Sequence, residues 1–291
     1  MEVKKAVIPA AGYGTRFLPA SKAIPKEMIP VVDRPTIQYV VEEAVESGIE
    51  EILLVTSKNK EEIENHFDFD RELEMVLAEK GKEDLLEKVR RVSDLITIHS
   101  VRQKKQKGLG HAVGCAETFV GDDHFAVLLG DDIMYSQKPV TEQLIDHAEE
   151  TGCPVIGCQE VSRDEIHLYG SVECSERSGR RASVANLVEK PEPEEAPSTL
   201  AVLGRYVLPP EIFPIIEETP PGKGGEIQLT DAIKTLARRR QVEAYDFEAR
   251  RYDVGNKQGF LEATVEFALR RDDISEEFSA YLQELLAEKN V

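Results

Sequence analysis

Residues 3–16 read VKKAVIPAAGYGTR, a short apolar run followed by a turn that contains two glycines. The run at Val3–Pro9 is typical of a buried strand. Apolar side chains then recur at helical spacing within Pro35–Gly48, and the final glycine ends that helix. Glu51–Thr56, with the sequence EILLVT, predicts a second strand. A strand, a turn and a helix that lead to another strand form the unit of a parallel sheet.

The same alternation continues through the first half of the chain. A short helix is expected to include Ile63–Phe67, and Glu72–Val92 forms a highly charged helical segment outside the core pattern. A strand at Leu95–Val101, a helix at Leu109–Phe119 and an apolar strand at Phe125–Leu129 follow. This βαβαβαβ order predicts a parallel sheet with helices on both faces.

The second half changes character, because strand-like runs are separated by turns and few helices intervene. These strands are expected at Val155–Val161, Gly170–Cys174, Ala185–Glu189 and Ala201–Val207, and later helices at Gln228–Arg240, Lys257–Arg271 and Ile274–Lys289. We therefore predict an α/β fold with a Rossmann-like mixed, mainly parallel central sheet and helices on both faces. We expect a single domain over 1–291, in which 1–135, 136–256 and the C-terminal helices of 257–291 form successive parts.

The charge balance limits the classes of partner. The 291 residues include 36 Lys and Arg but 55 Asp and Glu, a net charge of −19. Such a surface repels nucleic acid and anionic membranes, so neither is expected as a partner, and an anionic substrate needs a local cluster of cations. There is no signal-peptide segment of the usual length and no apolar run that approaches a membrane span, which predicts a cytoplasmic protein.

The cysteine spacing does not suggest a zinc site or a disulfide framework, because none of the four forms a C-x-x-C pair. We expect reduced, packed thiols. The four are Cys115, Cys153, Cys158 and Cys174.

The glycine-rich turn after the first strand is a candidate phosphate site. Gly12 and Gly14 allow backbone N–H groups to approach a phosphate closely. A dinucleotide fingerprint needs a third glycine where Phe17 stands, and the G-K-[ST] of a Walker A loop is also absent. The alternative is an ordinary turn with solvated lysines. Function is favoured because three cations follow within eleven residues, namely Arg16, Lys22 and Lys26.

Acidic residues end several predicted strands. Asp131 and Asp132 follow an apolar strand at the sheet edge where open α/β proteins bind ligands, and carboxylates there suit Mg2+. A helix-capping aspartate is about as probable an explanation for them. A capping turn is favoured for Asp253, and a surface strand end is favoured for Glu189-Lys190, when each is taken alone.

Residues 103–112, QKKQKGLGHA, form a basic loop that leads into a helix N-terminus, which favours anions. The amide of Gln103 offers both a donor and an acceptor to the edge of a base. His111 is expected to cap or pack, and we assign it no role.

Together these motifs make the chain resemble the bacterial UTP–glucose-1-phosphate uridylyltransferases, nearly end to end from Ala6 to about Leu269. Each stretch is weak or moderate alone, but their order is specific. The stretches are IPAAGYGTRFLPASKAIPKEMIPVVDRPTIQYVVEEA, QKKQKGLGHAV, LLGDDI, YGSVE, LVEKP, GRYVL, GGEIQLTDAI and RYDVGNKQGFLEATVEFAL. The resemblance implies synthesis of UDP-glucose and pyrophosphate from UTP and glucose 1-phosphate with Mg2+, in a homodimer or homotetramer. It assigns nucleotide binding to 1–135 and sugar-phosphate binding to 136–256.

The resemblance also implies individual roles. For the nucleotide, the backbone of Ala10, Ala11 and Gly12 faces uracil and ribose, and Gln103 and Gly108 read the base. For catalysis, Arg16 and Lys26 hold the β- and γ-phosphates, and Lys190 binds the phosphate of glucose 1-phosphate. For the sugar, Glu189 bonds the hydroxyls, Gly170 and Gly204 line the pocket, and Glu226 helps to close it. For the metal, Asp131 and Asp253 ligate Mg2+.

Two alternatives stay open at this point. A thymidylyltransferase that uses dTTP shares most of these motifs, although the charged segment Glu72–Val92 fits the uridylyltransferases better. A non-catalytic nucleotide-sugar sensor on the same fold is the second alternative. Intact leaving-group cations argue against it, because a sensor need not keep them.

Overall fold

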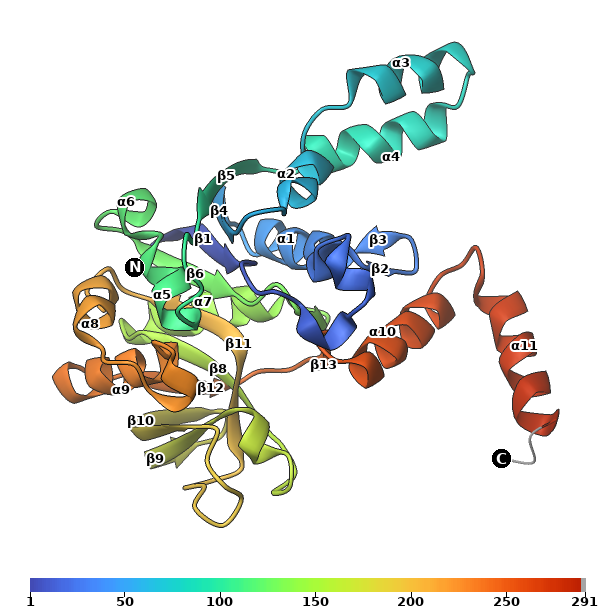
Figure 1. Ribbon diagram of the computed structural model, residues 1–291. Coiled ribbons are helices and arrows are strands. Elements are labelled where there is room, and N and C mark those ends of the chain that lie inside the picture. Colours follow the sequence, from blue (N-terminus) through green and yellow to red (C-terminus); the bar gives the residue numbers. More distant parts are fainter. Residues whose placement is uncertain (289–291) are drawn as a thin grey trace.

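The computed structural model describes residues 1–288, and its centre is one nine-stranded sheet (Figure 1). The strands run across the sheet in the order β5 (Thr97–Arg102), β4 (Glu51–Thr56), β1 (Val3–Pro9), β6 (His124–Leu128), β11 (Leu200–Leu208), β8 (Val155–Glu160), β12 (Glu243–Asp246), β10 (Arg181–Glu189) and β9 (Gly170–Ser178).

The sheet is mixed, as predicted, but it is not mainly parallel. The pairings β5–β4, β4–β1, β1–β6 and β8–β12 are parallel, whereas β6–β11, β11–β8, β12–β10 and β10–β9 are antiparallel. The parallel prediction therefore holds throughout β5, β4, β1 and β6, whereas in the second half of the described chain only β8 and β12 pair in parallel. The physical reason is visible in the hairpin between β9 and β10, where the loop Gly179-Arg180 reverses the chain with Gly179 at φ 60°. Such short loops can join only antiparallel strands.

Helices cover both faces of the sheet, which confirms that part of the prediction. On one face α1 (Thr36–Glu46) packs with the apolar side chains of β1, β4 and β6, and α7 (Val140–Thr151) packs onto β8 and β11. The opposite face is covered by α5 (Leu109–Gly114), α8 (Ile212–Glu218) and α9 (Leu229–Arg239). In α7, Val140, Leu144 and Ala148 are buried at intervals of four, which places one stripe of the helix on the sheet.

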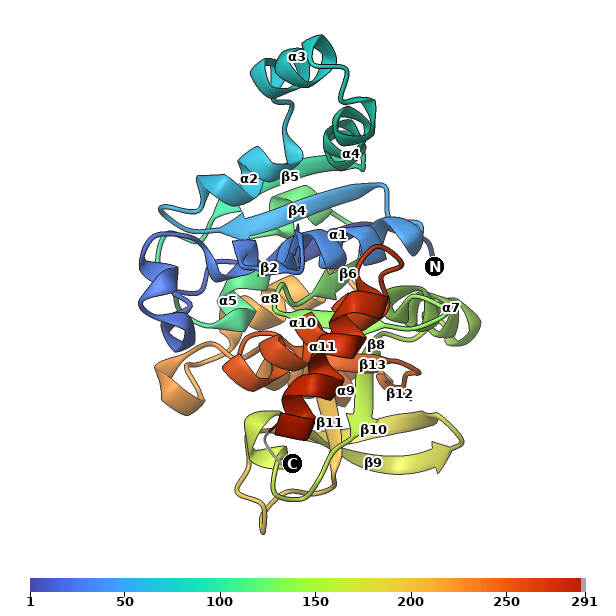
Figure 2. The same ribbon diagram turned by 90° about the vertical axis from the view of Figure 1, so that its right-hand side faces the viewer.

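The charged segment after α2 (Glu61–Phe67) leaves the sheet, as expected, but it forms two helices. α3 (Arg71–Glu79) and α4 (Glu83–Ser93) pack as a hairpin that projects beyond the β5 edge (Figures 1 and 2). Gly81, at φ 65°, lies in the turn that separates them. The predicted helix Leu109–Phe119 is likewise divided, into α5 and α6 (Glu117–Val120).

Smaller elements complete the described chain. Short turns of 3-10 helix lie at Thr15–Phe17, Ala20–Lys22, Lys26–Met28, Ile166–Leu168 and Lys223–Gly225. Two small ribbons pair β2 (Pro30–Val31) with β3 (Arg34–Pro35) and β7 (Asp132–Tyr135) with β13 (Arg250–Asp253). The C-terminal helices are α10 (Lys257–Leu269) and α11 (Ser275–Glu288), and the predicted end at Lys289 lies outside the described residues. No helix within 1–288 is long and apolar enough to cross a bilayer.

Candidate functional site

A cavity of about 780 Å³ lies at the carboxyl ends of the parallel strands β1, β4 and β5. Its walls come from the turn after β1, from the loop after β4 and from the basic loop after β5. Three of the predicted nucleotide and phosphate residues line it, namely Gly12, Lys26 and Gln103, together with Lys22, Lys58, Lys60 and Lys104. The cavity therefore has the local positive charge that an anionic ligand requires in this acidic chain.

Lys26, in the wall of this cavity, forms an ion pair with Asp131. The Lys26 Nζ donates to Asp131 Oδ2 at 2.5 Å. Burial opposes charge on both groups, but their attraction outweighs it, so the pKa of Lys26 is raised and that of Asp131 is lowered. Arg16 is exposed, and its positive charge has the smallest effect, which is to lower the pKa of Lys26. The pair keeps a full carboxylate beside a full ammonium at neutral pH.

The β7–β13 ribbon brings Asp253 to Asp131. Asp253 pairs with Asp132 in the ribbon register, and the Val254 N–H donates to the Asp131 carbonyl at 3.0 Å. Both carboxylates face Gly255, where an added Cβ would lie 2.7 Å from Asp131 Oδ2 and 3.0 Å from Asp253 Oδ1. The two predicted metal ligands thus converge from segments more than a hundred residues apart.

The donor set at this point fits Mg2+. The ion prefers near-octahedral oxygen ligands and is usually held by one or two carboxylates plus water and substrate phosphates. Two carboxylates converge here, and within residues 1–288 there is no group of three or more His, Cys, Asp or Glu side chains that could enclose a metal by themselves. The geometry therefore suits an ion that is completed by a bound substrate.

A second, smaller cavity of about 190 Å³ lies between β9, β10 and β11. It brings together all four residues predicted for the sugar and the predicted phosphate-binding lysine, which are Gly170, Glu189, Gly204, Glu226 and Lys190. Thr230 Oγ1 donates to Glu189 Oε2 at 2.6 Å, and Lys190 Nζ lies 3.3 Å from Glu189 Oε1. The wall is polar and its hydrogen-bonding groups are held in place, as a carbohydrate site requires.

Lys190 has an unusual backbone. It lies at φ 45°, in the left-handed region that residues other than glycine rarely adopt. Its N–H donates to the Tyr169 carbonyl at 2.9 Å, and its own carbonyl accepts from Lys223 Nζ at 2.5 Å. These bonds hold the strained residue at the end of β10. Strain of this kind is concentrated at functional sites, because surrounding contacts must maintain it.

Gly108 lines neither cavity, but it lies in the loop between Gln103, in the wall of the larger cavity, and Leu109, in the wall of the smaller one. At φ 101°, it passes so close to the segment of Glu226 that an added Cβ would lie 2.7 Å from the Glu226 Cβ. The Gly108 carbonyl accepts from Gln103 Nε2 at 3.2 Å, and the same amide lies 2.8 Å from His111 Nδ1. The packing explains why glycine stands there, and it places His111 behind Gln103 rather than in either cavity.

Lys60 and Glu27 are residues that the sequence interpretation missed. Lys60 Nζ donates to Glu27 Oε2 at 2.8 Å and to the Ala10 carbonyl at 2.5 Å, and both side chains are buried. Burial lowers the pKa of Lys60, although Glu27 opposes the effect. The pair ties the glycine-rich turn to the segment that carries Lys26. The sequence does contain a signal for Lys60, because this lysine follows the end of a parallel strand by four residues. It therefore lies at the edge of the sheet where ligands bind.

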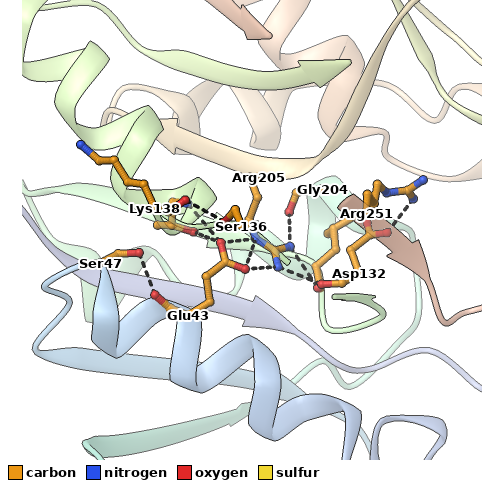
Figure 3. Close-up of polar contacts among 10 residues, drawn as sticks. Glu43, Ser47, Asp132, Ser136, Lys138, Gly204, Arg205 and Arg251 are labelled. Carbon is orange, nitrogen blue, oxygen red and sulfur yellow. Dashed lines mark hydrogen bonds and ion pairs between the residues drawn. The ribbon is translucent and has the colours of Figure 1, made fainter. Parts of the chain in front are cut away.

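Arg205 and Glu43 form a second missed pair, deeper in the core (Figure 3). Arg205, on β11, is fully buried and donates from Nε and Nη2 to the Glu43 carboxylate on α1. It also donates to the Asp132 carbonyl at 2.8 Å and the Gly204 carbonyl at 3.1 Å. The arginine therefore fixes the backbone at Asp132 and at Gly204, both of which line the smaller cavity. The signal was an arginine inside the apolar strand LAVLGRYVL, because a buried charge needs a partner.

Asp132 and Arg251 form a third buried pair, also drawn in Figure 3. Arg251 Nη2 lies 2.6 Å from Asp132 Oδ1, and both residues line the smaller cavity. Burial raises the pKa of Asp132 to about 6, although Arg251 opposes the rise. The sequence predicts Asp132 as one of two carboxylates after β6, with a metal role only for its neighbour Asp131.

Comparison with known proteins shows the family of the chain. A family model described as nucleotidyl transferase matches residues 5–269. The UTP–glucose-1-phosphate uridylyltransferase of Bacillus subtilis (strain 168) is 55% identical over 290 residues, which cover 100% of this chain and 99% of that protein. A UTP-bound UGPase from Acinetobacter baumannii superposes with a TM-score of 0.91 at 44% identity, covering 98% of this chain and 100% of that one.

A further solved structure is a UDP-glucose pyrophosphorylase complexed with UDP-glucose. It superposes with a TM-score of 0.86 at 42% identity and covers 93% of this chain and 100% of that one. Sequence and structure therefore agree over nearly the whole length. The chain belongs to the nucleotidyl transferase family, among its UTP–glucose-1-phosphate uridylyltransferases.

Proposed function

We propose that this chain joins UTP and glucose 1-phosphate into UDP-glucose and pyrophosphate, with Mg2+ as cofactor. One observation carries the proposal. The Lys26–Asp131 pair links the walls of the two cavities, since Lys26 lines the larger one and Asp132, next to Asp131, lines the smaller one. A nucleotide in one cavity and a sugar phosphate in the other would have their phosphates at this pair. The names of the relatives support the same pair of substrates.

The reaction needs positioning more than proton transfer. The second pKa of a phosphomonoester is roughly 6, so the nucleophilic phosphate of glucose 1-phosphate is mostly dianionic at neutral pH without a general base. Arg16 and Lys26 would neutralise the departing pyrophosphate, and Lys190 would hold the incoming phosphate. Asp131 and Asp253 would hold Mg2+, which would supply positive charge to offset the charge of the reacting phosphates. Alignment for in-line attack and charge stabilisation then account for the catalysis.

The decisive assay is pyrophosphate release with glucose 1-phosphate and Mg2+, compared across UTP, dTTP, ATP, CTP and GTP. We expect strong release with UTP. A preference for dTTP would make the chain a thymidylyltransferase that retains the same mechanism. If no nucleotide supports release but UDP-glucose binds, the sensor function would replace the enzyme.

Changing Lys190 to Ala should raise the KM for glucose 1-phosphate by about 10- to 100-fold and leave the KM for UTP within about threefold. The reason is that the lysine lines only the smaller cavity, and a lost charge-assisted hydrogen bond costs about 1.5–3 kcal/mol. Steady-state kinetics with each substrate varied in turn would measure both constants. Lys88→Ala, on the exposed face of α4, is the matched control. An unchanged sugar-phosphate KM would remove Lys190 from the site.

We further propose a cytoplasmic location and a homodimer or homotetramer. α11 supports an assembly, because it projects from the body of the protein and none of its described residues is buried (Figure 1). A helix of this length is marginal in water without packing. Light scattering of the purified chain at micromolar concentration would settle the point, and a monomer mass would exclude the assembly.

A further inference from the structure

Residues 222–226, with the sequence GKGGE, form a turn beside the smaller cavity. Glu226 at the end of this turn and Gln228 just beyond it both line that cavity. The Gly222 N–H donates to the Glu226 carbonyl at 2.8 Å, and Gln228 Nε2 donates to the Lys223 carbonyl at 3.0 Å. The base of the 222–226 turn is therefore attached to the wall of the cavity.

The tip of this turn is open. A Cβ added at Gly224 or Gly225 would meet no other segment of the described chain within 4 Å. From the tip, the side chain of Lys223 reaches the end of β10, where its Nζ donates to the Lys190 carbonyl at 2.5 Å. Both lysines are exposed, so this bond can open without disturbing the core. It links the turn to the strand end and is not part of the packed interior.

The link holds a strained residue. Lys190 lies at φ 45°, and its N–H is held by the Tyr169 carbonyl. Pro191 follows and has no N–H with which to anchor the chain on the other side. A residue other than glycine keeps a left-handed conformation only where surrounding contacts maintain it. Lys223 supplies the donor on the carbonyl side of Lys190.

The backbone of Lys190 sets the position of its ammonium group. Lys190 Nζ lies 3.3 Å from Glu189 Oε1, and Thr230 Oγ1 holds the other oxygen of that carboxylate at 2.6 Å. A change of φ at Lys190 would swing its side chain away from this partner and from the cavity wall. The ammonium of Lys223 also adds positive charge beside a cavity that is proposed to receive a dianion.

We propose that Lys223 is a positioning residue for Lys190, and that the 222–226 turn is a strap that holds this lysine at the sugar-phosphate cavity. The inference rests on the proposed function, because it takes Lys190 as the residue that binds the phosphate of glucose 1-phosphate. Neither lysine lines the larger cavity. Loss of the strap should therefore weaken capture of the sugar phosphate and leave the nucleotide unaffected.

Steady-state kinetics with UTP and Mg2+ would compare the wild-type enzyme with Lys223→Met and Lys223→Arg. We expect Lys223→Met to raise the KM for glucose 1-phosphate by about 3- to 10-fold, with the KM for UTP and the Tm unchanged. Lys223→Arg keeps a charged donor and should stay within about twofold of the wild type. Lys80→Met, which changes an exposed lysine at the end of α3, is the matched control and should alter neither KM.

A double-mutant cycle with Lys190→Ala separates positioning from a general effect. Without the Lys190 side chain, Lys223→Met should change kcat/KM for glucose 1-phosphate by less than about 1.5-fold, since the group that it positions is gone. The same loss with and without that side chain would overturn the proposal, as would an unchanged sugar-phosphate KM in Lys223→Met or an equal rise in both KM values. A wild-type enzyme that turns over no sugar phosphate would overturn the proposed function itself, and this inference with it.

Discussion

Replacing Asp131 by Ala should lower pyrophosphate release by roughly 10³-fold or more, while UTP binding measured without metal should not weaken. The carboxylate converges with Asp253 at Gly255 and pairs with Lys26, so it would hold the ion that neutralises the reacting phosphates. Without metal, the same carboxylate only repels UTP, and its removal frees Lys26 for the nucleotide. Catalysis and metal-free binding should therefore respond very differently.

The two quantities need separate measurements. Turnover is followed as pyrophosphate release at saturating Mg2+, and UTP binding by calorimetry in the presence of EDTA. Asp122→Ala removes an exposed aspartate before β6 and should affect neither. Equal losses in turnover and in metal-free binding would exclude Asp131 as a metal ligand and make it a structural partner of Lys26.

Changing Arg205 to Met should destabilise the fold by about 3–5 kcal/mol, because Glu43 would keep its charge in the core without a counter-ion. The backbone N–H and the hydroxyl of Thr141 still donate to Glu43 Oε1 in this variant. Because they partly stabilise the carboxylate, we expect a loss of stability at the lower end of this range. The Tm should fall by roughly 10 °C. Urea denaturation followed by circular dichroism would give the free energy of unfolding.

The double variant Arg205→Met with Glu43→Leu should recover much of the loss, since it removes both buried charges. Arg239→Met provides the exposed counterpart. This substitution breaks the ion pair between Arg239 and Glu218, and the side chains of both residues are more than half exposed. It should lower the free energy of unfolding by less than about 1 kcal/mol. A loss at Arg205 no larger than that at Arg239 would show that the buried pair contributes nothing beyond an ordinary surface pair.

The N-terminal half of the fold could be predicted because its signals are local. β1 and β4 have the predicted bounds, and α1 lies within the predicted helix. Periodic burial along one segment is a property of that segment, so it is readable without knowing what the segment packs against. The parallel order of these strands also follows, since each is joined to the next by a helix.

Strand direction in the second half was harder to predict. A strand that is buried on both faces shows the same apolar run whether its neighbours are parallel or antiparallel, as β11 does. The short loop at Gly179 was the available signal for reversal, but the pattern of β11 gave none. The β7–β13 ribbon has only four residues in each strand, too few for a period to appear.

Local sequence patterns identify the residues that can carry the chemistry, namely a glycine-rich turn, cations placed after parallel strands and carboxylates at strand ends. Which of these charges meet depends on how distant segments pack together. Lys60 reaches Glu27 and Ala10, Arg205 reaches Glu43 from 162 residues away, and Asp132 turns from its neighbour's side to face Arg251 and the smaller cavity. The physical reason is that burial patterns report whether a side chain is covered. The partner that compensates a buried charge is set by the packing of distant segments, which no local pattern encodes.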